Sequence, residues 1–259
     1  FQDEKFTAAL ENGLYKPYQN DQDLLVVLIM EFGRHFGTRG NEETVKMMWD
    51  YLRYTKYEYG PNQGLGRYEA APQGGFDKTH QLSLSNPTVK NQNPFVVENP
   101  QNKYCLVKLL QYYRGRCHPN QKRLFCHVNS NKKPENRYFF KPNSPVGGDK
   151  VREWVKKFAQ KAGYVDSEKY KPHDNRHRMV TVLASNPNVS DKIKMAQSRH
   201  KSLNSGLTYT HRNFTSESIV QNALQQGLTG SKPNVSIPEG NPVASVPEAK
   251  FVETEVIDI

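Results

Sequence analysis

Hydrophobic residues recur at intervals of three and four along several stretches of this chain, which places them on one face of an α-helix. The run LLVVLIM predicts a buried helix over residues 21–36. A second helix is expected after the break GTRGNEE, where Asn41 can cap it and two glutamates suit the positive end of the helix dipole. Its apolar positions are Val45, Met48, Trp49 and Leu52.

The same spacing continues in the second half of the chain. It predicts helices over residues 103–113, 173–184 and 190–197. A further helix is expected to begin with Asp149 as its cap and to end at Gly163. Helices therefore account for most of the periodic pattern.

The middle of the chain has a different pattern. Between about residues 57 and 98, glycines and prolines separate short stretches such as GRYEA and HQLSLS, which predicts an irregular hairpin or a three-stranded ribbon. Two short apolar pieces, LFCHV and YFF, flank the polar loop NSNKKPENR. The pattern as a whole predicts an α+β fold, mainly α with a small β-sheet.

The periodic pattern also suggests how the chain is divided. Residues 21–227 are expected to form one domain, and residues 1–20 a helical lead-in that ends in the turn YKPYQN. From residue 228 onward, four prolines together with Ser, Gly and Val leave no periodic pattern. Residues 228–259 are therefore predicted to form a flexible acidic tail.

The positive charge of the chain lies in its body. The formal net charge is +10, and residues 228–259 contain five acidic and two basic residues, so the remainder carries +13. A basic body favours polyanions, of which DNA and RNA are the commonest. An excess of surface lysine without any such partner is the alternative explanation.

The cysteines and the apolar runs narrow the class of protein. Cys105, Cys117 and Cys126 are odd in number and show no CxxC spacing, so they fit neither a disulfide framework nor a zinc site. A reducing compartment is expected. The longest apolar run, residues 24–30, is far shorter than a membrane span, so no membrane partner is expected.

Four features could carry chemistry. They are Arg39 in the string TRGNE, the pair His173 and Arg176 in HDNRH, His200, and Tyr209. The pair is three residues apart and therefore shares one helix face. Each feature also has an ordinary explanation when it is taken singly: a surface ion pair for the arginine, a solvated loop for His200, and amphipathic packing for the tyrosine.

The order and spacing of these residues resemble those of the tyrosine recombinases, or phage-type integrases. His200 follows His173 by 27 residues and precedes Tyr209 by nine. The segment SRHKSLNSGLTYTH is similar to the family pattern LGHxSxxTTxxYTH, and HDNRHRMVTVLAS is similar to its HxLRHxxAxxL helix. The string TRGNE resembles the family's first box, in which an arginine is followed three residues later by Glu.

Within that family, the chain is most similar to the Crypton-type recombinases of eukaryotes and their domesticated relatives. The strings GTRGNEETVKMMW and PVGGDKVREWVKKFAQKAGY carry this resemblance. It covers roughly residues 20–213, a catalytic domain without a separate DNA-clamping domain. The resemblance implies the recombinase catalytic-domain fold, double-stranded DNA as partner, DNA-dependent assembly of several protomers, and a nuclear location.

The resemblance also implies a role for each residue. Tyr209 would attack the scissile phosphate, forming a 3′-phosphotyrosyl link and releasing a 5′-hydroxyl, without metal or other cofactor. Arg39 and Arg176 would hold the non-bridging oxygens with bidentate, permanently charged donors. His200 would donate a hydrogen bond to the same oxygens, and His173 would assist proton transfer or hold the cluster in register.

Two positions depart from the family pattern. The family protonates the leaving oxygen with a lysine on a β-hairpin, and in GRYEAAPQGGFDKTHQ the nearest candidate is Lys78, which could equally be a solvated turn residue. Arg199 stands where the family usually has a glycine before the histidine. A catalytically silent DNA-binding or chromatin module of the same fold therefore stays open as an alternative, and a type IB topoisomerase as a third.

The stretch after the tyrosine could join protomers. In FTSESIVQNALQQ, Ile219, Val220 and Leu224 have helical spacing and could pack either against a neighbouring protomer or against the chain's own core.

Overall fold

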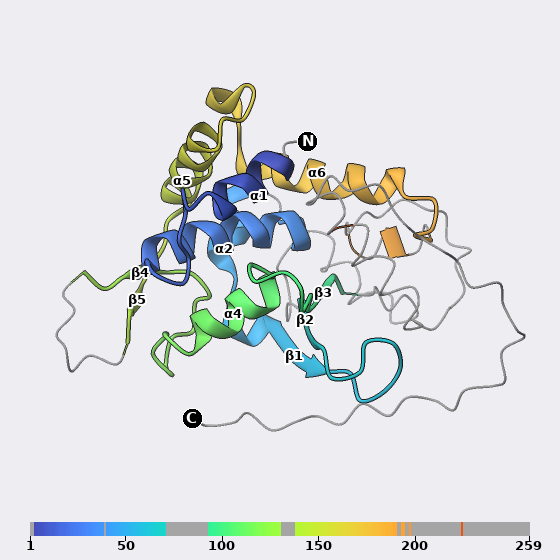
Figure 1. The fold of residues 1–259 in the computed structure, drawn as a ribbon. Helices are drawn as coiled ribbons and strands as arrows, with labels where there is room; N and C mark the ends of the chain where they lie inside the picture. Colours follow the sequence, from blue (N-terminus) through green and yellow to red (C-terminus); the bar gives the residue numbers. More distant parts are fainter. Residues whose placement is uncertain are drawn as a thin grey trace, which may run out of the picture.

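The computed structural model describes residues 3–38, 40–70, 93–130, 138–190, 193–194, 197 and 224, and Figure 1 shows their arrangement. The helices are α1 Asp3–Glu11, α2 Asp21–Phe36, α3 Gly40–Lys46, α4 Leu106–Arg114, α5 Gly148–Lys161 and α6 Pro172–Ser185. The strands are β1 Leu52–Lys56, β2 Gly66–Ala70, β3 Phe95–Val97, β4 Cys126–Val128 and β5 Phe140–Pro145. Short 3-10 turns cover Trp49–Tyr51 and Ser167–Lys169. The fold is a mixed α+β fold, as the sequence pattern predicts.

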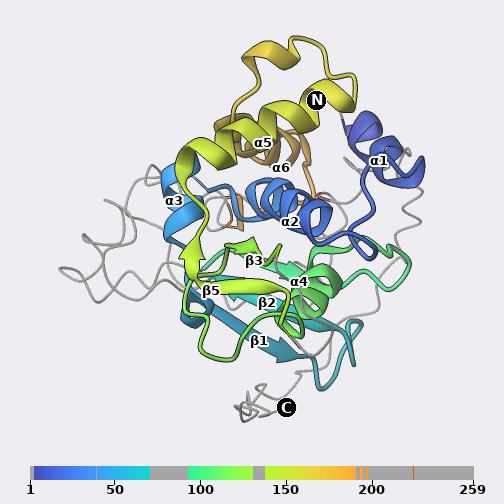
Figure 2. The same cartoon turned by 90° about the vertical axis from the view of Figure 1, so that its left-hand side faces the viewer.

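Helix α2 forms the centre of the fold, and fourteen of its sixteen residues are buried. The helix begins where the Asn20 side chain accepts hydrogen bonds from the backbone N–H groups of Gln22 and Asp23. It ends at Gly37, whose left-handed backbone stops the helix. Figure 2 shows α5 and α6 on one side of α2, and α4 with the sheets on the other.

The two sheets are small and antiparallel. The first has the order β1-β2-β3, with Tyr54 opposite Tyr68 and their rings 5.0 Å apart. The second joins β4 and β5, with a shift in register between Cys126 and Val128. This second pair is called the β4–β5 ribbon below.

Helix α1 packs into the main hydrophobic core of the fold. Phe6 is 1% exposed, and its ring lies 5.1 Å from that of Phe158 on α5. Tyr15, just after α1, stacks on the same Phe158 ring at 4.6 Å. A separate, smaller cluster of buried side chains lies between α6 and β3; its members are Tyr57, Phe95, Val97, Met179, Leu183, Val189, Ile193 and Leu224.

The position of Leu224 decides between the two alternatives for the stretch after Tyr209, which could pack against a neighbouring protomer or against the chain's own core. Its side chain is fully buried in this smaller cluster, and its carbonyl oxygen accepts a hydrogen bond of 3.1 Å from Arg178 Nη2 on α6. Leu224 therefore packs against the chain's own core, which is the second of the two alternatives. Ile219 and Val220 lie outside the described residues.

Several predicted elements are confirmed. Helix α2 has the predicted bounds, and α4 and α6 correspond to the helices expected over residues 103–113 and 173–184. GRYEA forms β2, and LFCHV and YFF contribute to β4 and β5. Of the helix expected over residues 190–197, Ile193, Lys194 and Gln197 are helical. The stretch HQLSLS and the predicted tail lie outside the described residues.

The predicted helix through Leu52 is wrong beyond Lys46. Met48 forms an isolated antiparallel bridge with Arg123, and the Trp49 N–H donates to the Lys122 carbonyl at 3.0 Å. Leu52 then begins β1. Pairing with a distant segment therefore overrides the local apolar spacing.

Two predicted caps are also wrong. Helix α3 begins at Gly40, so Asn41 lies inside its first turn. Helix α5 has Gly147 at its N-cap position, without a side-chain hydrogen bond. Asp149 lies one residue inside α5 and forms an exposed ion pair of 3.4 Å with Arg152. The predicted stop at Gly163 is confirmed by its positive φ of 68°.

None of the described helices is both long and apolar enough to cross a membrane.

Candidate functional site

The C-terminal end of α2 is where the first predicted box lies. Gly37 has φ 56° and ψ 44°, and its N–H donates to the Gly33 carbonyl at 3.0 Å. This left-handed residue turns the chain sharply, so that α3 starts only three residues later at Gly40. The hydroxyls of Thr38 and Thr44 lie 2.9 Å apart and brace the turn. Arg39 is within this turn and lies outside the described residues.

Helix α6 brings Arg176 to the same turn. Its Nη1 donates to the Gly37 carbonyl oxygen at 2.6 Å, and the residue is only 4% exposed. The two helices approach closely because α2 has glycine at the contact positions. A Cβ built on Gly33 would lie 3.1 Å from Asn175 Cβ, and one on Gly37 would lie 2.5 Å from Met179 Cε. Arg176 of the second box therefore hydrogen-bonds the residue just before the first box, within a tightly packed helix pair.

His173 lies one turn before Arg176 on α6. It is exposed, and its ring is 4.6 Å from that of His177 in an edge-to-face arrangement. Helical spacing predicts that His173 and Arg176 share a face. In the structure Arg176 is buried against α2 and His173 is exposed at the surface. His173 is therefore accessible from solvent beside the buried arginine.

The third predicted segment is anchored by a residue that sequence reasoning missed. Gln197 is fully buried, and its Nε2 donates to the His35 carbonyl at 2.8 Å and to the Phe95 carbonyl at 2.9 Å. Its Oε1 accepts from the Phe95 N–H at 3.2 Å. Gln197 precedes His200 by three residues, so the chain leading to His200 is fastened to the last turn of α2 and to β3. A lone glutamine carries no signal for this role in the sequence.

Lys78 belongs to the connection between β2 and β3, residues 71–94. Strand β3, at the far end of this connection, is the strand that Gln197 contacts. Lys78, His200 and Tyr209 lie outside the described residues, as does Arg199. What the structure brings together is therefore the Gly37 turn, Arg176, and the anchor that precedes His200.

A buried charge network lies along α2 behind this site. Asp3 Oδ1 accepts from Arg34 Nη2 and from Arg178 Nε, each at 2.5 Å. Glu31 Oε2 and His35 Nε2 are 3.1 Å apart. All five residues are at most 7% exposed. The network joins α1, α2 and α6 and, through Arg178, the Leu224 carbonyl.

The charged groups of this network shift one another's pKa values. Burial opposes ionisation of Glu31, but the hydrogen bond from His35 and the charge of Arg34 hold the pKa of this carboxyl below its usual value. Burial and the neighbouring charge of Arg34 lower the pKa of Arg178. Asp3 touches both guanidinium groups and is the carboxylate that holds them together.

The three cysteine thiols are free and buried. Burial raises the pKa of Cys117 to about 12 and that of Cys126 to about 11. These thiols are protonated at neutral pH and are poor nucleophiles in this state. Among the described residues, no group of three His, Cys, Asp or Glu side chains could hold a metal ion.

Replacing Gly37 tests the packing of the turn that carries Arg39. We expect Gly37→Ala to lower the free energy of unfolding by about 2–4 kcal/mol, from left-handed strain together with overlap of the new Cβ with Met179. Gly163→Ala is the matched control, because Gly163 also has a positive φ but has no atom within 4 Å of the added Cβ. It should cost about 1 kcal/mol. Equal losses in urea unfolding would show that the Met179 contact contributes nothing.

Comparison of the chain with protein-family models, with curated proteins and with solved structures returned no match.

Proposed function

We propose that the chain is the catalytic domain of a DNA-cleaving tyrosine recombinase, with the fold of that family. One observation carries the proposal: segments far apart in sequence meet at the C-terminal end of α2. Arg176 hydrogen-bonds Gly37, two residues before Arg39, and Gln197, three residues before His200, hydrogen-bonds His35. These contacts bring the chain next to the first box together with Arg176 of the second box and with the residue just before the third segment.

The proposed DNA cleavage requires that these distant segments lie close together. Cleavage of a phosphodiester by a phenol forms a pentavalent transition state with extra negative charge on its non-bridging oxygens. Two guanidinium groups, Arg39 and Arg176, supply charge-assisted donors to those oxygens. His200 adds a third donor, and Tyr209 is the nucleophile. His173, exposed beside Arg176, assists proton transfer.

The step balances without an external energy source. The Tyr209 phenol gives its proton to His173 and its oxygen forms a bond to phosphorus. The bond to the 5′-oxygen breaks, and that oxygen takes up a proton, which we assign to Lys78. The reverse attack by a 5′-hydroxyl restores the DNA backbone and frees the tyrosine. The partner is double-stranded DNA, the protomers assemble on it, and the location is nuclear.

The experiment is a suicide-substrate assay. In a nicked duplex, the short fragment that carries the new 5′-hydroxyl diffuses away after cleavage, so that the covalent protein–DNA adduct accumulates and is visible on a denaturing gel. We expect an adduct with the wild-type chain, without added metal, and none with Tyr209→Phe. Duplex binding without an adduct would instead identify a catalytically silent DNA-binding module. An adduct that persists in Tyr209→Phe would exclude this tyrosine as the nucleophile.

A further inference from the structure

The end of the β4–β5 ribbon near Phe140 lies away from the candidate site, whereas Phe125, just before β4, packs on Phe32 of α2. Arg116, close to the ribbon, donates to Asp21 at the first turn of α2 with an Nη2–Oδ1 distance of 2.6 Å, and its guanidinium stacks on Phe139 at 3.6 Å. The candidate site is at the last turn of the same helix. A helix of sixteen residues spans about 24 Å. Figure 1 shows the ribbon and the end of α6 on opposite sides of the molecule.

The part of the chain that contains the ribbon is strongly basic. Residues 99–148 contain ten Lys and Arg and one acidic residue, a net charge of +9 against +10 for the whole chain. Lys141 and Lys122 are exposed, and within the described ranges neither forms an ion pair with a carboxylate. Burial and the charges of Lys141 and Lys150 lower the pKa of His127 on β4. The ribbon therefore presents a local positive potential that suits a polyanion.

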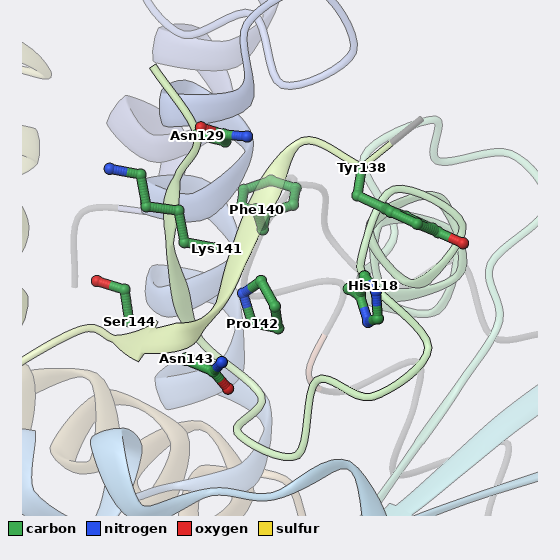
Figure 3. A pocket seen from close by; sticks show the side chains of 8 residues that line it. All are labelled: His118, Asn129, Tyr138, Phe140, Lys141, Pro142, Asn143 and Ser144. Atoms are coloured by element: carbon green, nitrogen blue, oxygen red, sulfur yellow. The ribbon is translucent and has the colours of Figure 1, made fainter. Parts of the chain in front are cut away.

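The ribbon also borders an open pocket of about 430 Å³, which is drawn in Figure 3. A ring pair, Tyr138 and His118, lies on one side of it with ring centroids 4.7 Å apart. Lys141 and Ser144 lie on the other side, with Pro142 between. Both rings of the pair are half-buried. None of the residues that line the pocket is acidic; the others are Asn129, Phe140 and Asn143.

An aromatic ring pair beside exposed cations favours one class of ligand. Aromatic side chains beside exposed cations bind single-stranded nucleic acid, because each unpaired base offers a flat face for stacking while its phosphates meet the cations. A duplex keeps its bases stacked on one another and offers such a site only its phosphates. Amide and hydroxyl groups at the rim can hydrogen-bond the edge of an unpaired base.

We propose that the β4–β5 ribbon binds single-stranded nucleic acid, with an unpaired base against the Tyr138–His118 ring pair and the adjoining phosphates on Lys141. This site is distinct from the proposed cleavage site and does not depend on it. It gives the chain a second nucleic-acid contact at the opposite end of α2.

The test uses fluorescence anisotropy of the full chain with a labelled oligothymidylate and with a duplex of equal length. We expect Tyr138→Ala to weaken single-strand binding about tenfold and to leave duplex binding unchanged, because only unpaired bases can stack. Tyr138→Phe keeps the ring and should bind like the wild type. Lys141→Glu should weaken single-strand binding and reduce its salt dependence. Lys169→Glu is the charge-matched control, since Lys169 is also exposed but lies away from the ribbon.

The possible results distinguish base stacking on the ribbon from a general attraction between the basic chain and nucleic acid. Loss of single-strand binding in Tyr138→Ala, with rescue in Tyr138→Phe, supports the proposal, as does ultraviolet crosslinking of an iodouridine oligonucleotide to Tyr138 or His118. If Tyr138→Ala and Lys141→Glu bind the single strand like the wild type, or if Lys169→Glu weakens binding as much as Lys141→Glu, the proposal is overturned. Equal loss of single-strand and duplex binding in Tyr138→Ala also overturns it. Circular dichroism of each variant establishes that it is folded.

Discussion

Replacing Asp3 by Asn is expected to destabilise the protein by about 3–5 kcal/mol. The Asp3 carboxylate accepts hydrogen bonds from Arg34 and Arg178, and all three side chains are buried. The neutral amide removes the carboxylate that contacts both guanidinium groups, so that Glu31 is the buried carboxylate that still acts on them. Urea unfolding followed by circular dichroism measures the loss.

Asp149→Asn is the matched control for this prediction. Asp149 also pairs with an arginine, Arg152, but its side chain is 98% exposed and the pair is screened by water. The stability of this variant should stay within about 1 kcal/mol of the wild type, the contribution of an acidic residue in the first turn of α5. A second comparison addresses the mechanism: Asp3→Leu combined with Arg34→Met and Arg178→Met should be more stable than Asp3→Leu alone, because no buried guanidinium group is left without the Asp3 carboxylate, while Glu31 keeps its contact with His35. If Asp3→Asn unfolds at the wild-type urea concentration, the network contributes nothing to stability.

Arg176→Lys is expected to slow cleavage of the suicide substrate by about 10²–10³-fold, the cost of losing one donor to the transition state. Lysine keeps the positive charge but has neither the planar fork nor the reach of the guanidinium. DNA affinity should change much less than the cleavage rate, since the other basic residues of the chain are unaffected. Rates of adduct formation at saturating protein measure the effect.

Arg178→Lys provides the comparison on the same helix. Arg178 is equally buried two residues further along α6, but it contacts Asp3 and Leu224 rather than the Gly37 turn. We expect it to lose stability, with a cleavage rate per folded molecule close to that of the wild type. A cleavage rate for Arg176→Lys within threefold of the wild-type rate would mean that Arg176 only hydrogen-bonds the Gly37 carbonyl and has no role in cleavage.

Elements with strong local signals are those that the sequence predicts well. Helix α2 has a capping asparagine at one end, a left-handed glycine at the other, and a continuous apolar run between them. The helix expected through Leu52 fails because Met48 and Trp49 pair with residues 122–123, more than seventy positions away. The apolar spacing there is compatible with either structure, and only the distant partner decides between them.

Prediction of the candidate site from the sequence is limited in the same way. A motif of known spacing identifies His173 and Arg176, and the structure adds the contact between Arg176 and Gly37. Gln197 and Asp3 could not be singled out, because a glutamine or an aspartate acquires its role only when tertiary packing buries it beside particular backbone groups or charges. The exposure of His173, against the burial of Arg176, likewise depends on how α6 packs on α2.

The central claim is that Tyr209 forms the bond to DNA, and peptide mapping of the trapped adduct tests it most directly. Trypsin releases residues 202–212, SLNSGLTYTHR, in which Tyr209 is the only tyrosine. After nuclease digestion of the adduct, mass spectrometry should find the nucleotide remnant on this peptide and, by fragmentation, on Tyr209. A remnant on any other residue, or no adduct from protein that binds the same duplex, would contradict the account.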